Sequence, residues 1–140
     1  MILHPKFYFF DTGVYRILRP SGPLDSPEEA QGSALETLLF QELRAINDYL
    51  HYSYQLHYWR TSNQQEVDFV LYGERGLKAF EVKRSSRLNS HDFKGLKAFQ
   101  TDFPMSQAFL IYGGNRKMRE GNIQVIPFTD CVKELPQLLK

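Results

Sequence analysis

The feature that most constrains the fold of this chain is a β-hairpin with strands at residues 66–72 and 77–83. Both segments are rich in aromatic and β-branched side chains, which is typical of strands. The four residues 73–76, Gly-Glu-Arg-Gly, join the strands as a turn. Because the turn sets the register of a hairpin, we expect Phe69 to lie opposite Phe80.

This register predicts a different character for each face of the hairpin. One face carries Val67 opposite Val82 beside the phenylalanine pair, an apolar layer suited to covering a core. The other face carries Asp68 opposite Glu81, with Lys83 two residues further along on the same side. Carboxylates that oppose each other across two strands repel, so they need a proton, a basic neighbour or a cation. Mg²⁺ binds to one or two carboxylates together with waters and phosphate oxygens, so this pair is a candidate metal site.

Two simpler interpretations remain open. The charged residues can be an ordinary solvated face, with Glu66 and Lys83 as a surface ion pair that contributes little stability. A register shift of one residue would also separate the two carboxylates. Val70 and Ala79 continue the carboxylate face as apolar residues, which indicates partial burial on both sides of the hairpin.

The rest of the chain alternates helical and strand patterns, which predicts a single α/β or α+β domain. The expected elements, in chain order, are a strand at 6–10, a helix at about 26–50 that begins at Ser26 and Pro27, a strand at 52–60, a helix from Ser90 to about Asp102, strands at 108–112 and 123–128, and a short last helix interrupted by Pro136.

Charge is distributed unevenly along the chain. The net charge is +1, which argues against a polybasic nucleic-acid binder, but residues 75–97 hold seven lysines and arginines against two acidic residues. This segment is where attraction for phosphates can concentrate, unless it is a solvated helix face. Arg84 and Arg87, which follow the second strand of the hairpin, are candidates for phosphate contacts. Arg60 ends an aromatic strand that can stack on bases, although such a strand is more often part of a core.

Composition also bears on the compartment. The single cysteine, Cys131, cannot form an internal disulfide, so we expect a reducing, cytoplasmic setting. No apolar run approaches the roughly 20 residues of a membrane-spanning helix, so no membrane association is expected. The chain also has no GxxxxGK[ST] loop and is not itself a P-loop nucleotidase.

The hairpin and the helix before it resemble the PD-(D/E)XK nuclease superfamily, with Asp68 on one strand and Glu81-Val82-Lys83 on the next. More closely, the chain resembles the domain of unknown function that lies C-terminal to the ATPase core of many prokaryotic AAA-type ATPases. The matching segments, in order, are KFYFFDTGVYRIL, GSALETLLFQEL, YWRTSNQQEVDFVL, AFEVKRS and GLKAFQTDFP.

The resemblance implies an α/β fold with a restriction-endonuclease-like core, in which helices flank a mixed central sheet. It implies that residues 1–25 are an N-terminal strand and connecting segment, the tail of a preceding region, and that residues 26–140 form the domain. The chain would then be the C-terminal part of a longer polypeptide that contains the ATPase core.

The resemblance also implies roles for four residues. Asp68 and Glu81 would bind Mg²⁺ or Mn²⁺, and Lys83 would orient the attacking water and stabilise charge on the phosphate. The helical acid of the superfamily corresponds best to Glu36. Helical spacing places Glu42 nearer to the centre of the apolar stripe, where it would need a partner such as Arg60 or Arg84.

These observations favour a metal-dependent endonuclease-like domain that hydrolyses phosphodiester bonds in DNA. The alternative is a catalytically inactive module of the same fold that docks the ATPase to nucleic acid or to a partner protein. The intact set of Asp68, Glu81 and Lys83 favours the enzyme, and the near-neutral total charge favours the docking module. The oligomeric state is left open.

Overall fold

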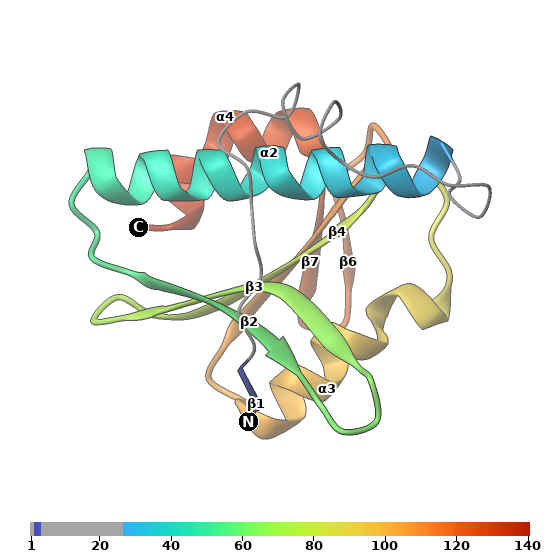
Figure 1. Cartoon of the computed structure of the whole chain (residues 1–140), viewed down its shortest axis with the longest axis horizontal. Coiled ribbons are helices and arrows are strands. Elements are labelled where there is room, and N and C mark those ends of the chain that lie inside the picture. Colours follow the sequence, from blue (N-terminus) through green and yellow to red (C-terminus); the bar gives the residue numbers. More distant parts are fainter. Residues whose placement is uncertain (1, 4–26) are drawn as a thin grey trace.

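The computed structural model describes residues 2–3 and 27–140, with side chains from residue 34 onward. Within these residues, seven strands form one sheet in the order β1-β2-β3-β4-β5-β7-β6 (Figure 1). The strands are β1 (Ile2–Leu3), β2 (Gln55–Arg60), β3 (Glu66–Gly73), β4 (Gly76–Lys83), β5 (Gln107–Tyr112), β6 (Met118–Glu120) and β7 (Ile123–Pro127). The strand expected at 6–10 and the expected helix cap at Ser26 lie outside the described residues.

The sheet is mixed, and helices cover both of its faces. Strands β1 to β4 pair in antiparallel fashion, β4, β5 and β7 pair in parallel, and β6 adds an antiparallel edge. Helices α2 (Pro27–Tyr49) and α4 (Phe128–Leu138) lie on one face (Figure 1). A short 3-10 helix η1 (Ser90–Phe93) leads into α3 (Lys94–Asp102) on the other face. The prediction of an α/β fold is confirmed.

Each face of the sheet has its own apolar core. Phe69, Phe80 and Phe109 pack with α2 and α4 on one side. Val70, Ala79, Leu110 and other buried residues pack with α3 on the other. Because helices cover both faces, the central strands are buried on both sides and read as nearly continuous apolar segments in the sequence.

The register predicted for the β3–β4 hairpin is confirmed near its turn, where Phe69 pairs with Phe80. The prediction that Val67 belongs to the same apolar layer as Phe69 is wrong, because Val67 packs in the core on the α3 face. The reason is a bulge: β2 advances two residues from His57 to Trp59, while its partners on β3 run three residues, from Val70 to Val67. The extra residue reverses the alternation of side chains in β3.

Two local predictions also need correction. Asn89, rather than Ser90, caps the helical segment, and Asn89 and Asp92 form a reciprocal capping box. Pro136 does not interrupt the last helix, which continues to Leu138. The edge strand β6 was not expected. No helix among the described residues is long and apolar enough to span a membrane.

Candidate functional site

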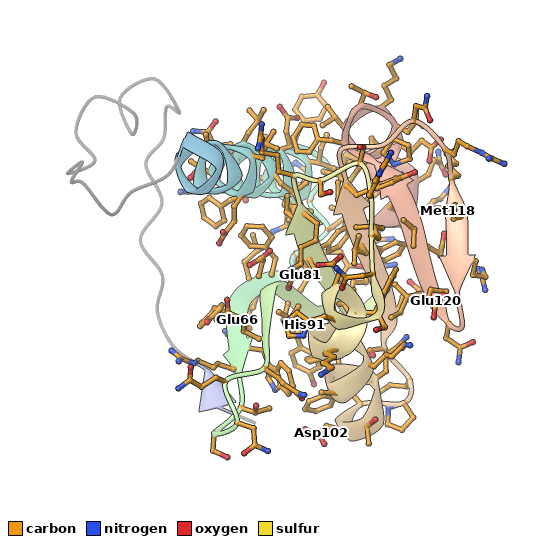
Figure 2. The ribbon with its side chains drawn as sticks, turned by 90° about the vertical axis from the view of Figure 1, so that its right-hand side faces the viewer. Glu66, Glu81, His91, Asp102, Met118 and Glu120 are labelled. Carbon is orange, nitrogen blue, oxygen red and sulfur yellow. The ribbon has the colours of Figure 1, made fainter. Side chains whose placement is uncertain are left out.

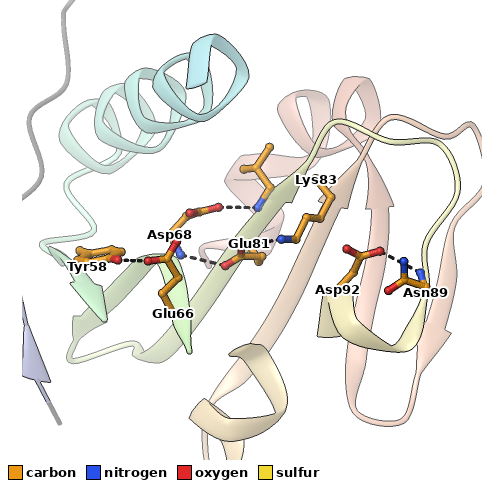
Figure 3. Close-up of polar contacts among 8 residues, drawn as sticks. Tyr58, Glu66, Asp68, Glu81, Lys83, Asn89 and Asp92 are labelled. Carbon is orange, nitrogen blue, oxygen red and sulfur yellow. Dashed lines mark hydrogen bonds and ion pairs between the residues drawn. The ribbon is translucent and has the colours of Figure 1, made fainter. Parts of the chain in front are cut away.

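The candidate site lies where β3 and β4 separate beyond the phenylalanine pair. The backbone pairing of the two strands ends at Phe69 and Phe80, so the next residues, Asp68 and Glu81, are not an ordinary cross-strand pair. Instead, the backbone N–H of Asp68 donates to Oε2 of Glu81 at 3.1 Å, and the backbone N–H of Val82 donates to Oδ2 of Asp68 at 2.9 Å (Figure 3). Each carboxylate therefore takes the place of a backbone acceptor on the opposite strand.

Both carboxylates are buried, with Asp68 5% and Glu81 6% exposed. Burial, and then repulsion from the Asp68 carboxylate, raise the pKa of Glu81 well above its ordinary value. Lys83 opposes this shift, since its Nζ lies 3.6 Å from Oε1 of Glu81 while its side chain remains 35% exposed. The structure thus brings together three of the residues selected from the sequence.

The fourth selected residue, Glu36, approaches the same place from α2. Its charge contributes to the raised pKa of Glu81, which puts the two acids within electrostatic range of each other. Glu42 forms no ion pair with Arg60 or Arg84 among the described side chains, so the partners expected for it are not found there. Glu36, unlike Glu42, is among the charges that raise the pKa of Glu81.

The donor set of the site suits a hard cation. Among the described residues, no group of three or more His, Cys, Asp or Glu side chains is close enough to hold a metal ion. Asp68 and Glu81 would therefore supply two carboxylates, and water would complete the coordination. Mg²⁺ commonly keeps several waters in this way, so the residues present fit that ion.

A cavity of about 380 Å³ opens beside Glu81, and Asp68 is not among its lining residues. Its walls come from the β2–β3 loop, from the ends of β3 and β4, and from the start of α3, and its lining residues are Asn63, Gln64, Gln65, Glu66, Glu81, Lys83, His91, Asp92, Lys94 and Gly95. Figure 2 shows Glu66, Glu81 and His91 gathered on the same side of the molecule. Glu81 and Lys83 are therefore accessible from the cavity.

Several lining residues were missed by the sequence analysis. Glu66 was considered only as a surface partner of Lys83, but it accepts a hydrogen bond from the hydroxyl of Tyr58 (Figure 3). Burial and this hydrogen bond raise the pKa of Tyr58. His91 and Lys94 were not singled out either, because their proximity to the site depends on how α3 docks on the sheet.

One sequence signal for that docking was present, the glycine at position 95. A Cβ atom there would lie 2.1 Å from the backbone carbonyl oxygen of Glu66, so only glycine allows α3 to approach β3 this closely. This contact joins the two walls of the cavity.

The basic segment 75–97 does not form one surface, so the expectation that its charges act together is wrong. Lys78 is only 4% exposed and donates to Gln107, Arg75 lies over the ring of Tyr52, and Lys97 pairs with Glu120. Of the remaining cations, Lys83 and Lys94 line the cavity, and Arg84 and Arg87 are exposed in the loop after β4. The segment is dispersed because it runs from the hairpin turn through β4 and the following loop into α3.

The three arginines selected as nucleic-acid contacts differ in setting. Arg84 and Arg87 are exposed in the loop that follows β4. Arg60 is half-buried at the end of β2, where it pairs with Glu66 in the sheet. Only Arg84 and Arg87 are therefore fully available at the surface. Cys131 is buried, and burial raises the pKa of its thiol to about 12.

Comparison with known proteins places the chain in a family. Residues 31–131 match the family described as a domain of unknown function (DUF4143). The match begins within α2, ends within α4, and includes both strands of the hairpin and every residue that lines the cavity. No curated protein matches the chain. Because the match covers more than half of the 140 residues, the chain belongs to the DUF4143 family.

Proposed function

We propose that this domain hydrolyses phosphodiester bonds in DNA with the help of Mg²⁺ or Mn²⁺. The observation that carries the proposal is the reciprocal contact of two buried carboxylates, in which Asp68 accepts from Val82 and Glu81 accepts from Asp68, with Lys83 beside them. Two carboxylates held together in this way cost stability unless a cation or a proton offsets their charge. A cost of this kind is typical of functional sites.

The chemistry follows from the side chains. Asp68 and Glu81 would hold the cation, and Mg²⁺ bound there would polarise a phosphate oxygen and make a bound water more acidic. Lys83 is partly exposed and lines the cavity, where its ammonium can stabilise negative charge that develops on the phosphate. Glu36, whose charge contributes to the raised pKa of Glu81, would orient a water or accept a proton.

The substrate and context are part of the same proposal. Arg84 and Arg87 are exposed in the loop that follows Lys83 in the chain and suit the negative backbone of DNA. The resemblance to domains that follow an ATPase core favours a role at the C-terminal end of a longer ATPase. The proposal also includes a nuclease core of the PD-(D/E)XK type, which rests on the same kind of resemblance. It includes a cytoplasmic setting for the protein as well.

A docking module without catalytic activity is the second candidate. One observation favours it: the carboxylates of Asp68 and Glu81 both accept backbone hydrogen bonds, so part of their acceptor capacity is satisfied without a metal. Such a module would keep the fold and bind DNA or protein without cleaving it.

The test is a cleavage assay on single-stranded and double-stranded DNA with Mg²⁺ or Mn²⁺. We expect metal-dependent cleavage by the wild type, a loss of about 10²–10³-fold in Lys83→Ala, and no cleavage by Asp68→Asn. Lys97→Ala is the matched control, since its ammonium pairs with Glu120 away from the cavity. A wild type that is inactive on every substrate with both ions would refute the nuclease proposal and favour the docking module.

A further inference from the structure

We infer that Lys94 and His91 form a second phosphate subsite, which binds the backbone phosphate next to the one that faces Glu81 and Lys83. The inference deepens the proposed function and rests on it, because it takes a phosphodiester chain as the ligand of the cavity. It adds that the substrate must present at least two consecutive phosphates on one strand.

The first argument is that both residues line the same cavity as the carboxylate site. Glu81 and Lys83 contribute to one wall, and His91 and Lys94 contribute to another. The cavity has a volume of about 380 Å³, which lies in the range of pockets that bind small ligands. It is large enough for more than a single phosphate group.

The second argument is that Lys94 is the cavity cation whose charge is still available. Lys83 is already 3.6 Å from Glu81, so its charge is partly offset within the site. Among the described residues, no carboxylate lies within ion-pair distance of Lys94, and no hydrogen bond to the imidazole of His91 is present. Both are exposed polar side chains without a protein partner in that part of the chain, as a phosphate-binding group must be before its ligand arrives.

The third argument is that the local structure holds these two residues in place. The capping box of Asn89 and Asp92 fixes the turn that carries His91, whose own N–H donates to Oδ1 of Asn89 at 2.9 Å. One turn later, Gly95 packs against the carbonyl oxygen of Glu66 and anchors the start of α3 to the sheet. Lys94 therefore projects from a fixed backbone position, which lowers the entropic cost of binding an anion.

Three acidic residues also line the cavity, and a contact within the protein orients each of them. Asp92 accepts the backbone N–H of Asn89 at 2.9 Å, and Glu66 accepts the hydroxyl of Tyr58. Glu81 pairs with Lys83. Each acid of the lining thus has a partner within the protein, whereas Lys94 has none among the described residues.

The experiment is a binding cycle with short fluorescein-labelled DNA strands, in which a single phosphate at a time is replaced by a neutral methylphosphonate. Dissociation constants are measured by fluorescence anisotropy in Ca²⁺, for the wild type, Lys94→Ala and Lys97→Ala. Lys97 is the matched control because it is a lysine of the same helix that pairs with Glu120 outside the cavity. Melting temperatures verify that each variant is folded.

We expect Lys94→Ala to weaken binding about tenfold and to lower the slope of log K against log salt by about 1. At one position of the DNA strand, a methylphosphonate should weaken binding to the wild type by a similar factor. The same methylphosphonate should not weaken binding to Lys94→Ala any further. The same linkage keeps its full effect in Lys97→Ala. His91→Ala should give a smaller loss at the same position.

The outcomes separate this inference from the nuclease proposal. If the effects of Lys94→Ala and of one methylphosphonate on binding are not additive, but the protein never cleaves DNA, the subsite is supported and the nuclease proposal is refuted. If the protein cleaves DNA but Lys94→Ala and Lys97→Ala weaken DNA binding equally, the subsite is refuted and the nuclease proposal is not. The same holds if the effects of Lys94→Ala and of the methylphosphonate on binding are additive at every position. Absence of any binding to the DNA strands overturns the subsite in either case.

Discussion

The two ends of the β3–β4 hairpin satisfy the backbone N–H groups of the strands in different ways. Near the turn, the strands form a regular ladder, and Phe80 is completely buried and stacks on Phe109 with ring centroids 4.7 Å apart. At the other end the backbone pairing stops, and two buried carboxylates occupy positions where backbone acceptors would otherwise lie. The first arrangement stabilises the fold. The second destabilises it and forms a polar site at the edge of a cavity.

This difference shows how a small domain can contain a site that lowers its folding stability. The ladder end is covered by helices on both faces, and its apolar packing supports the strands up to the point where they separate. The bulge in β3 then turns Asp68 out of the regular alternation without breaking the rest of the sheet. Stability and chemistry occupy adjacent parts of one hairpin, so substitutions at each end should have distinguishable effects.

The largest expected effect is at the ladder end. Phe80→Ala removes a fully buried ring and should lower the free energy of unfolding by about 3–5 kcal/mol, as measured by urea denaturation. Tyr72→Ala, on the same hairpin but 59% exposed, is the control and should change stability by no more than about 0.5 kcal/mol. Equal losses for the two variants would mean that the ladder end does not provide the stability attributed to it.

The next effect belongs to the separated end. If Asp68 and Glu81 bind Mg²⁺ or Mn²⁺, the ion should raise the free energy of unfolding by about 2.7 kcal/mol at a concentration 100 times its dissociation constant. Asp68→Asn should abolish the increase. Glu74→Gln, an exposed carboxylate in the turn at the other end of the hairpin, should retain it in full. Thermal melts across a metal titration measure all three, and an unchanged melting temperature in the wild type would argue against a metal site.

The smallest effect concerns Glu81 in the absence of metal. Its pKa is raised in the folded state, so folded protein binds a proton more tightly than unfolded protein, and stability should fall as pH rises above the ordinary value of 4.5. Glu81→Gln should flatten this decline and stabilise the metal-free protein by about 0.5–1 kcal/mol at pH 7, with less gain near pH 4. Urea denaturation in EDTA at several pH values measures the difference. A variant that is less stable than the wild type at pH 7 would contradict the interpretation.

The turn of the hairpin and the pairing next to it could be predicted because both depend on local sequence. Glycines at positions 73 and 76 set the turn, and the pairing of Phe69 with Phe80 follows from it. The prediction went wrong at Val67, since the bulge is defined by pairing with β2, which lies elsewhere in the sequence. Register is a property of both neighbouring strands, and one hairpin alone does not determine it.

The candidate site could be predicted in part for the same reason. Asp68, Glu81 and Lys83 lie close together because they are on one hairpin. His91 and Lys94 join them only after α3 has docked, and the mean charge of residues 75–97 gave no indication that Lys78 would be buried. The edge strand β6 was missed because all three of its residues are exposed and show no apolar alternation.

The contact between Gly95 and the carbonyl oxygen of Glu66 has a consequence for the speed of binding. It brings the helix wall and the strand wall of the cavity into contact through backbone atoms, so we expect the two walls to move together. A ligand then enters a space that already exists and does not wait for the walls to part. We expect association rates set by diffusional encounter and orientation, increased by attraction at low salt, with differences in affinity among ligands expressed mainly in how slowly they leave.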